Sequence, residues 1–164
     1  MNKLKKELLN LLGDNARYTY KQLADITGVS ESEAEAAVKE LEEDGVIVKY
    51  SAIVNTEAME ENDKVQALIE VKVAPQKLKG FDSCAEEIYG FKEVQSLYLM
   101  SGGFDLAVFV EGKSITDIAK FVSEKLSFID GIVGVQTHFI LKKYKIEGHI
   151  TKPFEEINRQ IIQA

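Results

Sequence analysis

Hydrophobic residues recur every three or four positions in the opening segment of the chain. Residues 3–12 contain leucines at this spacing, and Gly13 follows as a signal for the end of a helix. The pattern therefore predicts a first helix over residues 3–12. Thr19 and Gln22 have the spacing of a capping box, in which each side chain satisfies a backbone N–H group of the other residue. This pair predicts a second helix that runs to about Thr27.

A third helix is predicted directly after a glycine turn. Gly28 stands where the backbone would need a positive φ, and Ser30 and Glu33 form a second capping box that opens a helix to about Asp44. Two capped helices joined by such a turn are typical of a helix-turn-helix unit. The spacing alone fits an ordinary helical hairpin equally well.

The pattern changes after the third helix. Residues 46–54 are rich in β-branched side chains and predict a strand that leaves the helical unit. Residues 55–64 are polar and acidic, as in a linker. We therefore predict a helical domain over 1–54, with its connecting strand, and a linker over 55–64.

The second half of the chain alternates between strand and helix patterns. Residues 65–73 alternate between hydrophobic and polar side chains, as in a strand, and spacing of three and four marks the helices. The predicted elements are strand 65–73, helix 81–89, strands 94–100 and 104–110, helix 115–126 and strand 134–144. Their order, β-α-β-β-α-β, predicts a ferredoxin-like domain over 65–145 followed by a tail over 146–164.

Two predicted strands of this domain are hydrophobic without interruption. Residues 97–100 and 106–110 are consecutive hydrophobic residues, whereas two helices can cover only one face of a four-stranded sheet. The uncovered face is expected to bury itself against a second copy in a symmetric dimer. Packing of that face on the N-terminal helices of the same chain is the alternative.

Composition and charge narrow the class of protein. The chain has 164 residues, of which 45% are hydrophobic, enough to build real cores. Its N-terminus lacks a signal-peptide pattern and no hydrophobic run approaches the length of a membrane span, so we expect a cytoplasmic protein with no membrane partner. The formal net charge of -7 argues against general affinity for nucleic acid, because phosphate binding requires clustered Lys and Arg.

The sequence carries no motif of catalysis, nucleotide binding or metal binding. The single cysteine, Cys84, stands among hydrophobic residues at helical spacing and is expected to be a small buried side chain. His138 lies in a predicted strand and His149 in the polar tail, where structural or surface roles are expected. We therefore expect neither an enzyme nor a cofactor or metal site.

Four segments together give the chain a specific resemblance. They are residues 15–24, residues 28–32, residues 41–47 and Ser101-Gly102-Gly103-Phe104-Asp105-Leu106. On these the chain resembles the Lrp/AsnC family of prokaryotic transcriptional regulators over nearly its whole length. The resemblance implies an α+β protein with an N-terminal winged helix-turn-helix reader of double-stranded DNA and a C-terminal RAM-type ligand-sensing domain. It also implies an amino acid as effector, and assembly into dimers and often octamers.

The resemblance assigns the effector site to the glycine loop. The residues implied are Ser101, Gly102, Gly103 and Asp105. The chemistry fits, because glycine amides can approach a carboxylate closely and the Asp105 carboxylate can bind an α-ammonium group. The alternative is that the glycines only make a tight hairpin, which Asp105 caps.

The third helix departs from the family pattern. Residues 31–44 hold seven acidic residues and a single basic one, Lys39, for a net charge of -6. DNA contacts must then come from the edges of the reader and from the N-terminus of this helix. The candidates are Arg17, Tyr18, Lys21, Ser30, Ser32, Lys39 and Lys49.

Two functions follow from these observations. The first is a transcriptional regulator that binds DNA and responds to a small molecule, in which the effector shifts the assembly and repositions paired readers. The alternative is an oligomeric small-molecule sensor or scaffold with little or no DNA binding, favoured by the acidic third helix.

Overall fold

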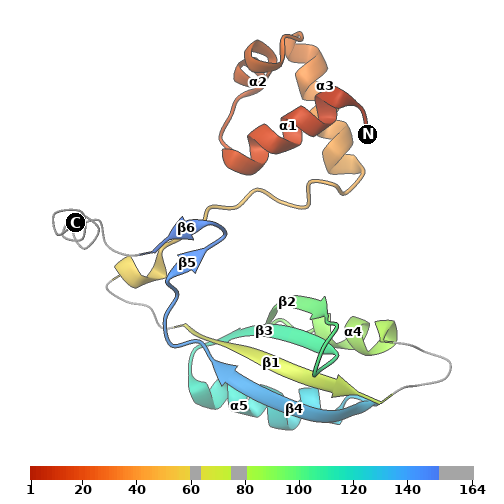
Figure 1. Cartoon of the computed structure of the whole chain (residues 1–164), viewed down its shortest axis with the longest axis vertical. Helices are drawn as coiled ribbons and strands as arrows, with labels where there is room; N and C mark the ends of the chain where they lie inside the picture. Colours follow the sequence, from red (N-terminus) through yellow and green to blue (C-terminus); the bar gives the residue numbers. More distant parts are fainter. Residues whose placement is uncertain (60–63, 75–80, 152–164) are drawn as a thin grey trace. The chain divides into compact units, whose positions relative to one another are not determined.

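The chain divides into two compact units, Met1–Val54 and Asn55–Ala164. The structure is a computed structural model that describes residues 1–59, 64–74 and 81–151 (Figure 1). Because the two units are separate bodies, each is described by itself.

The first unit consists of three helices around a small hydrophobic core. They are α1 (Lys3–Asp14), α2 (Tyr20–Thr27) and α3 (Glu31–Glu43), which confirms the three predicted helices. Leucines and alanines of all three pack together, and the alanines allow close approach of the helices. The buried residues of this core are Leu8, Leu23, Ala24, Ala34, Ala37 and Val38.

The prediction of a strand over residues 46–54 is wrong for the isolated chain. No regular element lies between Glu43 and Thr56, and the side chain of Val48 is 87% exposed. A strand exists only when its backbone is hydrogen-bonded to a neighbour, and no described segment pairs with this one. Residues 46–54 therefore have the composition of a strand without its hydrogen-bonded pairing.

The described part of the second unit is built on a four-stranded antiparallel sheet with two α-helices. Its elements up to the last long strand are η1 (Thr56–Ala58), β1 (Val65–Val73), α4 (Asp82–Tyr89), β2 (Val94–Leu99), β3 (Leu106–Gly112), α5 (Ile115–Glu124), η2 (Leu126–Phe128) and β4 (Ile132–Phe139). The strand order is β2-β3-β1-β4, and every neighbouring pair is antiparallel. This is the ferredoxin-like arrangement predicted by the element order.

Both helices pack on the same face of the sheet. Alternate residues of β1 and β3 are buried there against side chains of α4, α5 and η2. The core consists of Ala67, Ile69, Val71, Val73, Cys84, Ile88, Leu106, Val108, Val110, Ile118, Phe121, Leu126 and Ile129. Cys84 is buried in it, which confirms its predicted place.

The opposite face of the sheet, here called the outer face, has a hydrophobic centre. The strand register puts Leu68, Tyr98 and Phe109 there, with the Tyr98 and Phe109 rings 5.9 Å apart in an edge-to-face contact. Polar residues flank them, including Glu70 and His138, whose Oε1 and Nε2 atoms are 3.2 Å apart. The uninterrupted hydrophobic runs thus divide between the two faces.

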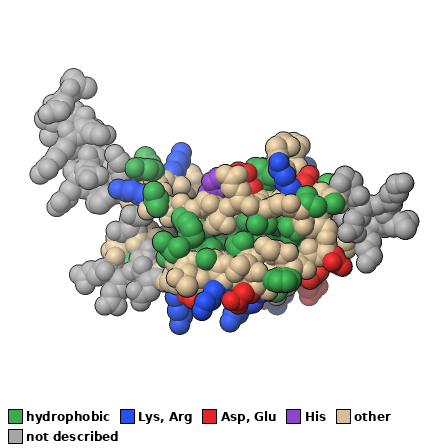
Figure 2. All heavy atoms as spheres, turned by 90° about the horizontal axis from the view of Figure 1, so that it is seen from below, with side chains coloured by type: hydrophobic (Ala, Val, Ile, Leu, Met, Phe, Trp, Pro, Cys, Tyr) green, Lys and Arg blue, Asp and Glu red, His purple; other side chains and the backbone are tan. Residues whose placement is uncertain are grey.

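Hydrophobic side chains also remain visible on the surface of the chain. In the space-filling view they form a band across the middle of the face shown, bordered by Lys, Asp and Glu side chains (Figure 2). A single copy therefore leaves part of its hydrophobic surface uncovered.

No helix in the described parts of the chain is long and apolar enough to cross a membrane.

The end of the sheet domain differs from the prediction. β4 stops at Phe139 instead of near residue 144, because after the bond from the Ile140 N–H to the Gln66 carbonyl (2.8 Å) the start of β1 offers no further partner. The chain then forms a small hairpin of β5 (Lys145–Ile146) and β6 (His149–Ile150), where only a tail was expected. Residues 152–164 of the expected tail, and 60–63 of the expected linker, lie outside the described residues.

Because the two hydrophobic cores share no residue, we predict that they unfold separately. Leu23→Ala should lower the free energy of unfolding of the first unit by about 2–5 kcal/mol, the usual cost of a cavity at a fully buried leucine. The matched change Val108→Ala should destabilise the second unit alone. Hydrogen exchange resolved by segment measures both, and parallel loss of protection in the two units would contradict separate unfolding.

Candidate functional site

The starts of α2 and α3 are each built by a reciprocal capping box. The Thr19 hydroxyl accepts from the Gln22 N–H (3.2 Å), and the Gln22 side chain accepts from the Thr19 N–H (2.9 Å). Ser30 and Glu33 repeat this arrangement at 3.3 and 2.9 Å. Gly28 lies between them at φ 73°, a left-handed conformation that favours glycine. The sequence thus determines both helix starts and the turn, as predicted.

The capping box also engages a predicted DNA contact. The Ser30 hydroxyl donates to the Glu33 carboxylate (2.6 Å), and these bonds hold the pKa of Glu33 below its usual value. Ser32 lies 3.2 Å from Ser30, oxygen to oxygen, and is exposed. Because the Ser30 proton goes to Glu33, Ser32 is the donor to Ser30, and both hydroxyl protons have partners within the chain. An outside acceptor would therefore meet mainly the free backbone N–H groups at this helix end.

Lys39, the single cation of α3, is paired within the helix. Its Nζ lies 2.8 Å from the Glu35 carboxylate one turn earlier, and this hydrogen bond raises the pKa of Lys39. The lysine stays charged, but Glu35 compensates its charge locally. Among the predicted DNA contacts, Lys39 is therefore weakened by its own helix.

The C-terminal part of α3 is held by other side chains of the first unit. Lys5 of α1 lies 2.9 Å from the Glu40 carboxylate and 3.7 Å from that of Asp44. The Tyr50 hydroxyl donates to Glu42 (2.7 Å), and burial together with this bond raises the pKa of Tyr50 to about 12. Several carboxylates of α3 thus have structural partners within the reader.

The remaining predicted DNA contacts lie at separate places. Arg17 is exposed ahead of α2, Lys21 is exposed in the first turn of α2, and Lys49 is exposed after α3. None of these three cations lies within ion-pair distance of a carboxylate in the described parts of the chain. Tyr18 instead packs half-buried against the helical core. The exposed cations without an ion-pair partner among the described residues thus lie at the edges of the reader.

The predicted effector loop joins β2 to β3 and spans residues 100–105. It is longer than the predicted turn, and neither Gly102 nor Gly103 has a positive φ, so the tight glycine-dependent hairpin is wrong. A Cβ built on either glycine meets no atom within 4 Å. The fold of a single copy therefore requires glycine at neither position.

Asp105 attaches this loop to the central strand. Its carboxylate accepts from the Val73 N–H (2.8 Å), and its own N–H donates to the Val71 carbonyl (2.9 Å). This bond satisfies a backbone donor at the point where the β1 to β4 register shifts. The Asp105 carboxylate thus bonds β1 through Oδ2, and it does not cap a tight glycine hairpin as the structural alternative had it.

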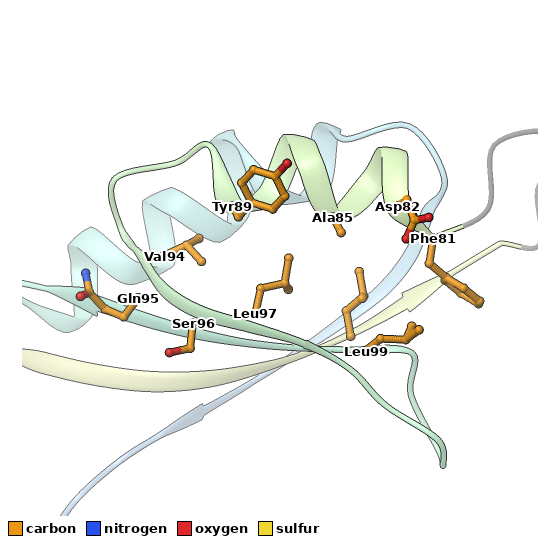
Figure 3. Close-up of a pocket in the computed structure, with 10 residues that line it drawn as sticks. Phe81, Asp82, Ala85, Tyr89, Val94, Gln95, Ser96, Leu97 and Leu99 are labelled. Atoms are coloured by element: carbon orange, nitrogen blue, oxygen red, sulfur yellow. The ribbon is translucent and has the colours of Figure 1, made fainter. Parts of the chain in front are cut away.

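A cavity of about 370 Å³ lies between α4 and β2, beside the ends of the loop. Figure 3 shows Tyr89 and Ala85 of the helix facing Leu97 and Leu99 of the strand across it. Its lining is mostly hydrophobic, with polar groups of Asp82, Gln95 and Ser96. The sequence analysis did not find this cavity, because its residues come from two segments that only the fold brings together.

The remaining side chain that could carry chemistry is the thiol of Cys84, which is buried. Burial, with a smaller contribution from Glu87, raises the pKa of the Cys84 thiol, which disfavours the reactive thiolate. The described residues contain no group of three or more His, Cys, Asp or Glu side chains that could hold a metal ion.

Comparisons with known proteins cover both units. Residues 66–150 match the family profile described as Lrp/AsnC ligand binding domain, and residues 1–48 match a winged helix-turn-helix DNA-binding profile. The chain is 41% identical over 156 residues to an uncharacterized HTH-type transcriptional regulator, YugG, of Bacillus subtilis, covering 95% of this chain and 94% of that one. It is 32% identical to the regulator LrpA of Pyrococcus abyssi, covering 85% and 96%.

Solved structures show the same fold. A transcriptional regulator of Neisseria meningitidis, in complex with L-methionine, superposes with a TM-score of 0.67 at 24% identity, covering 96% of this chain and 99% of that one. AsnC of Escherichia coli superposes with a TM-score of 0.66 at 22% identity, covering 93% and 99%.

The charge of α3 generates a prediction about affinity for DNA. Glu35→Arg with Ala36→Arg removes the partner of Lys39 and adds two cations. We expect affinity for arbitrary duplex DNA to rise about tenfold to a hundredfold near 0.1 M salt, with a steeper salt dependence, because each phosphate neutralised releases a counterion. Fluorescence anisotropy against salt concentration measures both quantities.

The matched control changes the net charge equally on α5. Glu124→Arg with Ala119→Arg alters two exposed positions of that helix and should have little effect. An equal gain in both variants would mean that net charge alone acts. No gain in either would mean that α3 does not face DNA.

Proposed function

The chain belongs to the Lrp/AsnC family of transcriptional regulators, and from this premise we propose that it binds DNA through α2 and α3 and senses an amino acid at the loop of residues 100–105. The observation that carries the sensing part is the glycine pair beside a fixed carboxylate. Gly102 and Gly103 are required neither by their φ angles nor by crowding within the chain. Their lack of side chains is then explained by a bound effector that approaches the backbone closely.

An amino acid fits the chemistry of this loop. Backbone N–H groups of glycines can approach an α-carboxylate closely. The Asp105 carboxylate gives one oxygen to the Val73 N–H, which leaves the other for an α-ammonium group. Ser101 adds an exposed hydroxyl. The structural role of Asp105 and its proposed role in binding are therefore compatible.

On the DNA side, the reader would position itself mainly by phosphate contacts. The exposed cations Arg17, Lys21 and Lys49 have the chemistry for such contacts. The backbone N–H groups at the start of α3, beside Ser32, would meet the DNA at the helix N-terminus. With few cations on α3, each reader binds weakly, and several readers in one assembly supply avidity.

Assembly would run through the outer face of the sheet. Leu68, Tyr98 and Phe109 form its hydrophobic centre, which the helices do not cover. A symmetric pair of such faces buries the centre and leaves the polar flanks at the rim. Effector binding would then shift the equilibrium among assemblies and change the spacing of the readers.

A second candidate function is an oligomeric sensor or scaffold that binds little DNA. The observation that favours it is the acidity of α3, where Glu35 compensates the single lysine. Genomic footprinting of the native protein with and without candidate amino acids separates the two functions. Protected sites that change with an amino acid support the regulator, and the absence of protected sites supports the scaffold.

The proposed effector site predicts that Asp105→Asn weakens binding of the amino acid about tenfold to a hundredfold. Asparagine keeps an oxygen that can accept from the Val73 N–H but loses the charge that binds an ammonium group, and a charge-assisted hydrogen bond contributes about 1.5–3 kcal/mol. Calorimetry with a panel of the common amino acids measures the affinity, and the melting temperature should stay nearly constant.

Two further variants sharpen this test. Asp82→Asn makes the same change at the cavity between α4 and β2 and should leave the affinity unchanged. Gly103→Val should fold normally, since a Cβ there meets nothing within 4 Å, yet should lose the ligand. Loss of binding in Asp82→Asn alone would move the site to the cavity.

The proposed assembly predicts that Phe109→Glu dissociates the dimer. Two unpaired carboxylates would be buried in one symmetric interface, and each such burial costs several kcal/mol. The dimer dissociation constant should rise about a hundredfold or more, by the equivalence of about 1.4 kcal/mol to a factor of ten. Sedimentation equilibrium measures it. Phe128→Glu, at a ring that is 78% exposed on η2, is the control and should leave the dimer intact.

A further inference from the structure

Three lysines occur within four positions where the chain leaves the sheet. Lys142, Lys143 and Lys145 lie between the end of β4 and the start of the hairpin, and Lys142 and Lys145 are exposed. Residues 140–151 contain a single acidic residue, Glu147. This cationic segment, residues 142–145, therefore stands out in a chain whose formal net charge is -7.

The charge of this segment is little compensated at Lys142 and Lys145, whereas Lys143 is attracted electrostatically to Glu111. No described carboxylate lies within ion-pair distance of Lys142, Lys143 or Lys145. The Lys142 Nζ instead lies 5.4 Å from the centre of the Tyr144 ring, a contact that keeps the cation at the surface. The segment contrasts with α3 of the reader, where Glu35 pairs with Lys39.

The backbone of the segment is fixed by hydrogen bonds. The buried Thr151 donates from its hydroxyl to the Lys143 carbonyl and from its N–H to the Tyr144 carbonyl (3.1 Å). The Asn55 side chain donates to the Thr151 carbonyl (2.8 Å). Figure 1 shows the corresponding proximity, with η1 beside the β5–β6 hairpin. The lysines are therefore presented on ordered backbone.

The same bonds join the segment to the point where the chain arrives from the reader. Asn55 is the first residue of the second unit and follows directly on Val54, the last residue of the first. A hollow of about 110 Å³ opens here, lined by Thr56 of η1, Lys142 and Lys143, and by Lys64 with its partner Glu111, 2.8 Å away. Cations thus gather where the reader is attached.

We propose that Lys142, Lys143 and Lys145 bind phosphates of the DNA that the reader occupies, which makes the sensing unit a second DNA-contacting surface. This inference rests on the proposed function. Duplex DNA is the partner because Lys142 and Lys145 offer exposed point charges with no described carboxylate at ion-pair distance, which suits a phosphate chain and no particular base. It also supplies cations that the acidic reader lacks, since residues 1–54 hold seven basic and ten acidic residues.

The test is affinity against salt concentration for the full chain and a random-sequence duplex several helical turns long. Lys142→Gln with Lys145→Gln removes two phosphate contacts. Each contact contributes about a factor of eight near 0.1 M salt, so the variant should lose up to about 60-fold in affinity, and its slope of log affinity against log salt should fall by about 1.8. Lys142→Arg with Lys145→Arg keeps the charges and should bind as the wild type does.

The matched control is Lys113→Gln with Lys120→Gln, which removes two exposed lysines elsewhere in the same unit. Light scattering on each variant establishes that the assembly is unchanged, so that lost avidity is not mistaken for lost contacts. An equal loss in the test and control variants, or no loss in either, overturns this inference and leaves the proposed function intact. Absence of binding by the wild type to this duplex, even at low salt, overturns this inference, whereas the proposed function fails only if footprinting finds no protected sites.

Discussion

The sheet of the second unit depends on the burial of β1, whose side chains at Ala67, Ile69 and Val71 are fully buried against the core. β1 has hydrogen-bonded neighbours on both edges, β3 and β4, so every other part of this unit is positioned relative to it. The loop of residues 100–105 is one such part, since Asp105 bonds the backbone at the end of β1. A proposed ligand site is thereby attached to the most buried strand, whose position packing determines.

Charge sets a second constraint on this protein. A reader helix with a net charge of -6 over residues 31–44 repels a polyanion, unlike a recognition helix that carries its own cations. In the proposed function, affinity would then come from the edges of the reader, from the number of readers in the assembly, and from the cationic segment 142–145. An effector that alters the assembly would have a large effect on such binding, because avidity disappears when geometry forbids simultaneous contacts.

Local signals in the sequence predicted most elements correctly. The two capping boxes and Gly28 determined the helix-turn-helix, because each involves residues at most three positions apart. Alternation determined which residues of β1 are buried, and the motif at 101–106 indicated the loop now proposed as the effector site. Errors arose where an element depends on a distant partner. Residues 46–54 have strand composition, but no strand among the described residues pairs with them, and the pairing of β4 with β1 ends at Phe139.

The sequence by itself thus determined the helices, the four strands of the main sheet, their order and the acidity of the reader, because periodicity, caps and charge are properties of neighbouring residues. Only the tertiary structure decided which consecutive hydrophobic residues face the core and which lie on the outer face. It alone brought Asp105 to Val73, α4 to β2 around a cavity, and Asn55 to Thr151 beside the lysines. These contacts join residues far apart in the chain, and their formation depends on strand register and packing of the whole unit, which no local pattern specifies.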